Sequence, residues 1–260
     1  MEPALIEIGL EAVRLGAAIV KESYGRATNI SYKSTIDLVT DVDRRAEERI
    51  ISFLQLKSPH CGILAEEQDE IPGREAARWI LDPLDGTTNF AHGYPFFCVS
   101  LALEQSGRTV WGAVLDPLRD ELFSAQRGQG AFCNGAPVRV SDTTHLNRAM
   151  LCTGFPYDVH ESSADNLDHF TRLIKKARAI RRDGAAALDL CYVAMGRFDG
   201  FWEMKLKPWD MAAGNLIVTE AGGRVSDFDG GKINPAAGAV LATNGHLHDC
   251  ISDILACDRS

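Results

Sequence analysis

The hydrophobic pattern at the start of the chain predicts two amphipathic helices. Apolar side chains recur at helical spacing over residues 3–23, from Leu5 to Ile19. A second helix is expected to start near Asp41, because acidic residues occupy its early turns and an apolar stripe follows from Ile50 to Leu56. Residues 29–40 between them are polar and irregular, so no regular element is expected there.

From residue 61 the pattern is typical of strands. Residues 61–65 form a short apolar run, and a loop over 68–76 separates it from a second run that starts at Trp79. Strand-length segments then follow one another, separated by Gly, Pro and Arg turns, at 97–104, 109–116, 120–125 and 130–133. This region predicts a sheet meander that follows the two helices.

The second half of the chain alternates between strands and helices. Strands are expected at 149–153, 179–182, 198–204 and 239–243, and helices at 163–178, 185–196 and 209–221. We therefore expect an α/β (α+β) chain of two layered subdomains that share one interface. Residues 1–144 would form the N-terminal α+β subdomain and residues 145–260 the C-terminal α/β subdomain, as one unit over 1–260.

Composition and charge narrow the class of protein. The 260-residue chain is 45% hydrophobic, which is ordinary for a globular protein, and it has no apolar run long enough to span a bilayer. Its acidic N-terminus lacks the basic region of a signal peptide. With a net charge of −9, the chain as a whole lacks the excess of basic residues that is typical of proteins that bind nucleic acid. A bound cation would therefore have to supply the local positive charge for an anionic substrate.

The cysteines and histidines predict neither a nucleophile nor a metal site. The seven cysteines are odd in number and form no C-x-x-C pair, and several lie in apolar runs. This favours buried free thiols in a reducing cytoplasm over disulfides or zinc ligands. His246 and His248 lie in a loop flanked by Gly and Asn, where we expect them on the surface.

Acidic residues occupy the ends of several predicted elements. Such ends are where α/β proteins usually place sites, and carboxylates that converge there repel one another. A hard divalent cation such as Mg²⁺ relieves the repulsion, since carboxylates and backbone carbonyls are its usual ligands. Each residue alone is more often a cap or a solvated charge, so the argument depends on the combination. The set comprises Asp43, Glu66, Asp82, Asp85 and Asp210.

The segment 82–87 (DPLDGT) combines cation ligands with groups that bind anions. Pro83 fixes φ and removes one N–H, so the turn is stiff and both aspartates and the Leu84 carbonyl can face one pocket. Gly86 and Thr87 stand at a predicted helix start, where N–H groups and the helix dipole favour phosphate. Together these features indicate metal-assisted phosphoryl chemistry, which requires no Cys or His nucleophile.

Two long motifs carry a resemblance to a known family. Residues 79–90 (WILDPLDGTTNF) closely resemble the first signature of the inositol monophosphatase family, and residues 209–223 (WDMAAGNLIVTEAGG) resemble its second signature. The similarity also runs through residues 37–43, 65–67 and 184–187 and through Glu203. It covers essentially the whole chain in the right order and at fitting separations.

The resemblance implies a magnesium-dependent, lithium-sensitive phosphomonoesterase with a layered αβαβα sandwich of the sugar-phosphatase type, usually a homodimer. By resemblance, Glu66, Asp82 and the Leu84 carbonyl would hold a first Mg²⁺. Asp82, Asp85 and Asp210 would hold a second. Glu66 and water molecules would bind a third ion more weakly, so the site would hold two to three ions.

The resemblance also implies catalytic and substrate contacts. Thr87, with Asp43, would orient and deprotonate the attacking water, and Glu66 would complete the catalytic group. The N–H groups of Gly86 and Thr87 would bind phosphate. Lys33 is similar to a lysine of the family's mobile loop, although its spacing to Asp37 is one residue shorter. The positions that match contacts to the sugar or cyclitol are Asp85, Ala186, Glu203 and Asp210.

The expected reaction is the hydrolysis of inositol 1-phosphate to myo-inositol and phosphate, with Glu203 as the best specific support. Related branches act on fructose 1,6-bisphosphate, histidinol phosphate or 3′-phosphoadenosine 5′-phosphate. These alternatives call for additional basic residues, and the candidates are Arg178, Arg181, Arg182 and Arg197. Surface or dimer-interface charge is the preferred interpretation of Arg181 and Arg182. A third alternative is a regulatory binding protein, because some bacterial relatives engage the transcription machinery.

Overall fold

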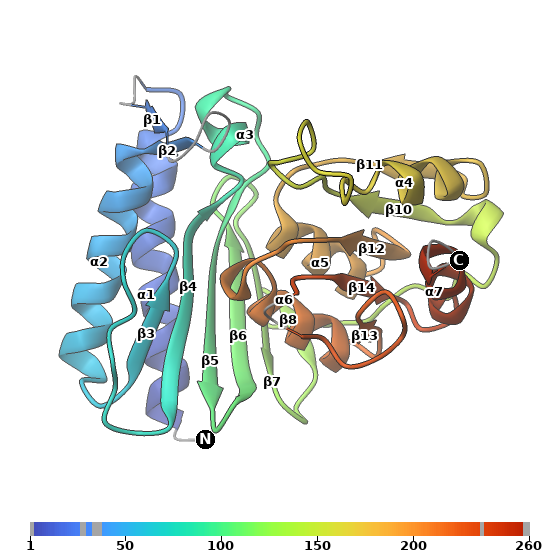
Figure 1. The fold of residues 1–260 in the computed structure, drawn as a ribbon. Helices are drawn as coiled ribbons and strands as arrows, with labels where there is room; N and C mark the ends of the chain where they lie inside the picture. The colour runs from blue at the N-terminus through green and yellow to red at the C-terminus, as the bar shows by residue number, and fades with distance from the viewer. Residues whose placement is uncertain (1–2, 27–29, 33–37, 235–236, 257–260) are drawn as a thin grey trace.

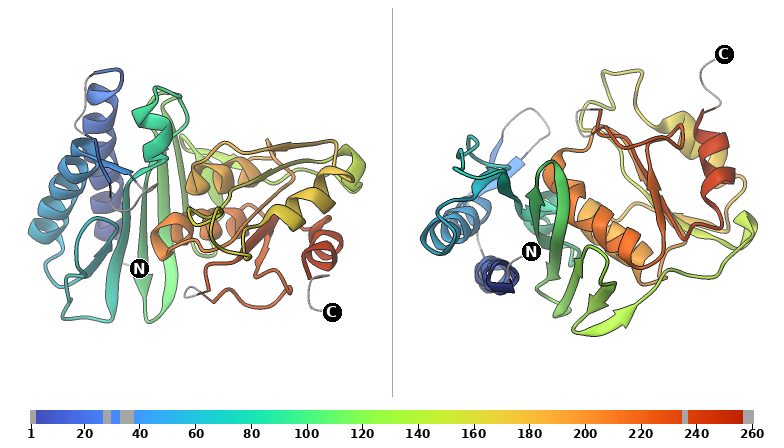
Figure 2. Two further views of the ribbon diagram at one scale, coloured as in Figure 1. Left: turned by 45° about the horizontal axis from the view of Figure 1, so that its top comes forward. Right: turned by 90° about the horizontal axis from the view of Figure 1, so that it is seen from below.

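Helices and sheets alternate in layers in the computed structural model, which describes residues 3–26, 30–32, 38–234 and 237–256. Helices α1 and α2 cover the outer face of a seven-stranded sheet, and α5 and α6 lie between this sheet and a five-stranded one (Figure 1). Helices α4 and α7 cover the far face of the five-stranded sheet. The views in Figure 2 show the same order of layers. The predicted αβαβα sandwich is confirmed.

The helices of the described residues differ widely in length. They are α1 Pro3–Ser23, α2 Asp41–Lys57, α3 Thr87–Ala91, α4 Leu167–Ile174, α5 Ala186–Ala194, α6 Pro208–Glu220 and α7 His248–Ala256, with a 3₁₀ turn at Leu146–Arg148. In the described part of the chain, none of them is both long and apolar enough to cross a membrane. The two predicted N-terminal helices and the helices over 185–196 and 209–221 are confirmed to within two residues at either end.

The seven-stranded sheet runs in the order β3-β4-β5-β6-β7-β8-β9, with β3 parallel to β4 and all other pairs antiparallel. Trp79 and Leu81 contact the helices α1 and α2, whereas Ile80 points to the core around α5 and α6. Because helices cover both faces, the central strands are nearly continuous apolar runs. The strands are β3 Gly62–Ala65, β4 Ala77–Asp85, β5 Cys98–Gln105, β6 Arg108–Asp116, β7 Glu121–Gln126, β8 Ala131–Cys133 and β9 Ala136–Val138.

The five-stranded sheet runs in the order β11-β10-β12-β14-β13. Strand β10 pairs in parallel with β11 and β12, and β14 pairs antiparallel with β12 and β13. Its strands are β10 Met150–Thr153, β11 Ala179–Arg181, β12 Gly200–Glu203, β13 Arg224–Ser226 and β14 Val240–Thr243.

Several elements differ from the sequence-based predictions. Residues 29–40 were expected to be irregular, but β1 (Ile30–Tyr32) and β2 (Leu38–Thr40) pair there as an antiparallel ribbon. The pairing is made by backbone groups, which the polar side chains of this segment do not reveal. The helix expected over 163–178 is confined to α4. Strands β9 and β13 and helix α7 were missed, because elements of three to nine residues carry too little periodicity.

Helix α6 approaches the seven-stranded sheet closely because β6 carries Gly112. A Cβ atom at that position would lie 2.8 Å from the Cα of Ala213 on α6. Only glycine permits this distance without a shift of the helix. The close contact fixes the N-terminal turn of α6 beside the end of β4, where the predicted site lies.

Candidate active site

A pocket of about 460 Å³ lies where β4 ends and α6 begins. It draws on both sheets and on the loops that follow β10 and β12. Of the predicted metal and substrate residues that the structure describes, all line this pocket: Glu66, Asp82, Leu84, Asp85, Gly86, Thr87, Ala186, Glu203 and Asp210. Asp43 lies beneath Thr87 instead, and Lys33 falls outside the described residues.

A β-bulge places Asp82 and Asp85 on the same side of the sheet. Asp82 lies opposite Ser100 of β5 and Asp85 opposite Cys98, so three steps along β4 match two along β5. Two steps along a regular strand return to the same face, whereas three do not. Both carboxylates therefore face α6, whose Trp209 carbonyl accepts a hydrogen bond from Ser100.

Asp82 is a deeply buried carboxylate that is 2% exposed. Burial raises the pKa of Asp82 well above its usual value, and the negative charges of Glu66, Asp85 and Asp210 raise it further. Its Oδ1 accepts one hydrogen bond, from the Leu84 amide at 3.0 Å. The three neighbouring carboxyl groups are therefore close enough to disfavour the ionised form of Asp82.

Asp85 connects the end of β4 to helix α5. Its Oδ2 accepts a hydrogen bond from the Ala187 amide at 2.7 Å and lies 3.6 Å from the Sγ of Cys98. Burial raises the pKa of Asp85 to about 6, although the Ala187 hydrogen bond lowers it. The carboxylate is thus held in place by the first turn of α5.

Thr87 is hydrogen-bonded to the buried carboxyl group of Asp43. The Oγ1 of Thr87 donates to Oδ1 of Asp43 at 2.9 Å and also lies 3.0 Å from the Leu84 carbonyl oxygen. The other oxygen of Asp43 accepts hydrogen bonds from the amide and hydroxyl of Thr40, which caps α2. Burial raises the pKa of Asp43, and these hydrogen bonds lower it.

Gly86 makes the sharp turn between β4 and α3. Its φ of +94° is a left-handed conformation that favours glycine. A Cβ atom here would also lie 3.0 Å from the Phe96 carbonyl oxygen and 3.2 Å from the Cβ of Ala185. The turn therefore depends on this glycine both for its conformation and for its packing.

Asp210 and Glu203 face the pocket from the second half of the chain. The structure corrects the prediction that Asp210 opens its helix, because α6 begins at Pro208 and Asp210 accepts a hydrogen bond from the capping Lys207 amide at 2.6 Å. Burial and the charge of Asp210 raise the pKa of Glu203 to about 8, while Arg182 lowers it. A Cβ atom on Gly154 would overlap both carboxyl oxygens of Glu203.

The donor set of the pocket fits a hard divalent cation. It offers carboxylate oxygens and a backbone carbonyl, which are the ligands that Mg²⁺ takes. A second group of side chains that could bind a metal lies outside this pocket. In the part of the chain that the structure describes, the potential ligand atoms of Cys152, Asp183 and Asp189 lie within 4.8 Å of one another.

Sequence reasoning missed several residues of the site. The segment 154–158 lines the pocket but has no charge pattern or motif that marks it. The Thr40 hydroxyl was missed too, although a Thr before a predicted helix is a known capping signal. Of the candidate arginines, Arg182 lines the pocket, whereas Arg197 forms an ion pair with Glu121 elsewhere.

The prediction that His246 and His248 are both on the surface was half wrong. His246 is exposed, but His248 is fully buried and lies 3.0 Å from the Thr243 hydroxyl and 2.8 Å from that of Ser226. The Gly and Asn residues that suggested a loop precede α7 rather than surround the pair. The six described cysteines are free thiols, and four of them are buried.

The fold and the pocket define a phosphatase of the layered αβαβα class. A solved structure of the extragenic suppressor protein suhB from Bartonella henselae superposes with a TM-score of 0.92 at 40% sequence identity. That alignment covers 98% of this chain and 99% of the other.

Sequence comparison gives the family. The model of the inositol monophosphatase family matches residues 3–258. An inositol-1-monophosphatase from Synechocystis is 43% identical over 96% of this chain and 88% of its own length. A protein named Nus factor SuhB from Pseudomonas aeruginosa is 46% identical over 94% of this chain and 92% of its own length. The chain belongs to the inositol monophosphatase family, whose members are generally metal-dependent.

Proposed function

We propose that this protein hydrolyses inositol 1-phosphate to myo-inositol and phosphate, with Mg²⁺ and an attacking water. The observation that carries the proposal is the gathering of Glu66, Asp85 and Asp210 around the buried Asp82, whose pKa their three charges raise. Carboxylates gathered in a buried pocket favour a bound cation, and a phosphate dianion needs the same cation.

The proposed ligand set follows the family resemblance. Glu66, Asp82 and the Leu84 carbonyl would hold one Mg²⁺, and Asp82, Asp85 and Asp210 would hold a second. Glu66 would also contribute to a third, weaker site. When bound, Mg²⁺ lowers the pKa of water and neutralises charge on the phosphoryl oxygens.

The residues of the chain supply position and proton transfer. Thr87 orients the attacking water and passes its proton towards Asp43, with which it shares a hydrogen bond. The N–H groups of Gly86 and Thr87 bind phosphate. Glu203 forms hydrogen bonds with ring hydroxyls, beside Ala186, Asp85 and Asp210. Lys33 is proposed as a further, loop-borne contact.

A substrate panel tests the proposal. We expect magnesium-dependent kcat/KM to be highest for inositol 1-phosphate among four compounds, the others being fructose 1,6-bisphosphate, histidinol phosphate and 3′-phosphoadenosine 5′-phosphate. Of the candidate arginines, Arg182 lies in the pocket wall, where a basic side chain favours the bisphosphate alternatives. A higher kcat/KM for one of these would reassign the substrate, and activity on none of them would overturn the phosphatase proposal.

A second function is favoured by the relatives named Nus factor SuhB, one of them 41% identical from Escherichia coli. We propose that this chain also contacts the transcription machinery. Capture of RNA polymerase by the wild-type protein and equally by Asp82→Asn would support a contact independent of catalysis. No capture by either would contradict it.

Three further features complete the proposal. We infer a homodimer, a cytoplasmic location and two subdomains that divide near residue 144. Size-exclusion chromatography with light scattering tests the first. Cell fractionation tests the second, and separate expression of the two halves tests the third.

A further inference from the structure

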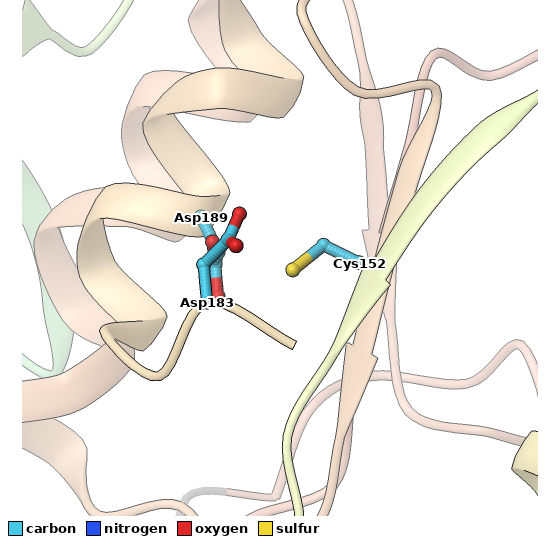
Figure 3. A group of neighbouring side chains, drawn as sticks. All are labelled: Cys152, Asp183 and Asp189. Carbon is cyan, nitrogen blue, oxygen red and sulfur yellow. The ribbon is translucent and has the colours of Figure 1, made fainter. Parts of the chain in front are cut away.

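Cys152, Asp183 and Asp189 gather between β10 and α5, beyond the phosphatase pocket. Cys152 lies on β10, Asp183 in the loop after β11, and Asp189 in the first turn of α5, and Figure 3 shows their side chains turned towards one another. Each offers one ligand-type atom, and the three atoms lie within 4.8 Å of one another. The three residues therefore converge from different elements on one small volume.

Asp189 brings to this cluster a buried carboxyl oxygen that has no hydrogen-bond partner among the described residues. The side chain is 1% exposed, and its Oδ1 has no hydrogen-bond partner among the described residues. Buried polar atoms are nearly always paired, because an unpaired one costs about 1–3 kcal/mol. Burial raises the pKa of Asp189 well above its usual value, and the charges of Asp183, Glu203 and Asp85 raise it further. A hydrogen bond from the Cys152 thiol to this carboxyl group lowers the pKa of Asp189, but Oδ1 itself has no partner among the described residues.

We propose that Cys152, Asp183 and Asp189 bind one thiophilic divalent cation of the zinc class. A thiolate with carboxylates is a ligand set that suits Zn²⁺ and does not suit Mg²⁺, which avoids sulfur. The site therefore differs in ligand chemistry from the oxygen-only phosphatase pocket. It also does not depend on what that pocket hydrolyses.

The geometry of the cluster allows such an ion. Zinc bond lengths place two tetrahedral ligand atoms roughly 3.3–3.5 Å apart, so the three atoms need to close by at most about 1.5 Å. Cys152 is fully buried, whereas Asp183 is only partly buried and gives the ion an entry from solvent. A water would complete the fourth position.

An ion here would support the wall of the phosphatase pocket. The backbone carbonyl of Asp183 accepts a hydrogen bond from Asn89 of α3 at 2.7 Å. Four residues further on, the Ala187 amide donates to Asp85. The cation would tie the segment that carries both of these contacts to strand β10. Its role is therefore structural support of residues 183–189.

Cobalt titration tests the proposal, because a Co²⁺–thiolate bond gives a charge-transfer absorption that oxygen ligands do not give. In the metal-free, reduced protein we expect one equivalent of Co²⁺ to produce this band, and Zn²⁺ to displace it. Cys152→Ser should abolish the band. Asp189→Asn and the partly exposed Asp183→Asn should weaken Co²⁺ binding about tenfold or more.

Controls separate this site from the phosphatase pocket, where Cys98 lies 3.6 Å from Asp85. Cys98→Ala and Asp82→Asn should both keep the band. Circular dichroism of each variant confirms that it is folded, and Asp183→Asn remains informative if Cys152→Ser does not fold. No thiolate band in the wild type would overturn the proposal. So would a band that Cys98→Ala removes and Cys152→Ser retains.

Discussion

The Thr87 hydroxyl and the Asp43 carboxyl group form a hydrogen bond of 2.9 Å that joins the pocket to the start of α2. Asp43 is fully buried and does not line the pocket, so it acts only through Thr87. Thr40 fixes the far oxygen of the same carboxyl group. The N3 residue of the α2 capping box is therefore also the proposed base of the catalytic pair.

Thr87→Ala should lower kcat by roughly 10²-fold or more, in the range of general-base assistance. The variant removes the hydroxyl that positions the water, whereas Thr87→Ser retains it and should keep most of the activity. Steady-state kinetics on inositol 1-phosphate separates the effect on kcat from the effect on KM. An effect on KM alone would assign Thr87 to substrate binding.

Asp82→Asn should abolish turnover and also stabilise the metal-free protein. A buried carboxyl group with a raised pKa disfavours folding at neutral pH, so its replacement by an amide should gain about 1 kcal/mol or more. Urea unfolding in EDTA measures the gain, with the exposed Asp69→Asn as a matched control. Near-full activity of Asp82→Asn would contradict the metal assignment.

Gly154→Ala should displace Glu203, because the new Cβ overlaps both of its carboxyl oxygens. We expect a loss of about 1–3 kcal/mol in stability, which is typical of overpacking, together with a higher KM. A double-mutant cycle with Glu203→Ala is the sharp test. The glycine substitution should cost little once the glutamate is shortened, and additive losses would argue against the contact.

The stability of the metal-free protein should fall as the pH rises from about 4.5 to 8. Glu203 has a folded pKa of about 8 against a usual 4.5, so the folded state holds a proton that the unfolded state releases in this range. One such group lowers the free energy of unfolding by up to about 1.4 kcal/mol per pH unit. Unfolding in EDTA at several pH values should show a shallower slope for Glu203→Gln.

Lithium should inhibit turnover in the millimolar range. Carboxylates that take Mg²⁺ also attract a small, hard monovalent cation, and the family resemblance points to the second ion, which Asp82, Asp85 and Asp210 would hold. Potassium chloride at equal ionic strength is the control for screening. Insensitivity to lithium would weaken the assignment of the second ion but not the phosphatase proposal.

Local apolar patterns predicted most helices and strands, whereas the αβαβα layers and the site residues were expected from the family resemblance. The structure gathers the described pocket residues in one place, and their roles stay predictions. Apolar periodicity marked the long helices, and the signatures around Asp82 and Asp210 marked the pocket. The β-bulge escaped notice, because a register shift depends on the partner strand and not on β4 itself. The cluster at Cys152 escaped as well, since its residues are separated along the chain and form no metal-binding spacing.

The β-bulge of β4 has a consequence for the choice of cation. Asp82 and Asp85 belong to a strand that pairs with β5 at both positions, not to a loop. Their backbone is therefore fixed before any ion arrives. A rigid frame suits a small ion with strict octahedral geometry and poorly accommodates Ca²⁺, which takes six to eight oxygens in looser arrangements. At the proposed metal site, a preference for magnesium over calcium would thus originate in a single additional residue of one strand.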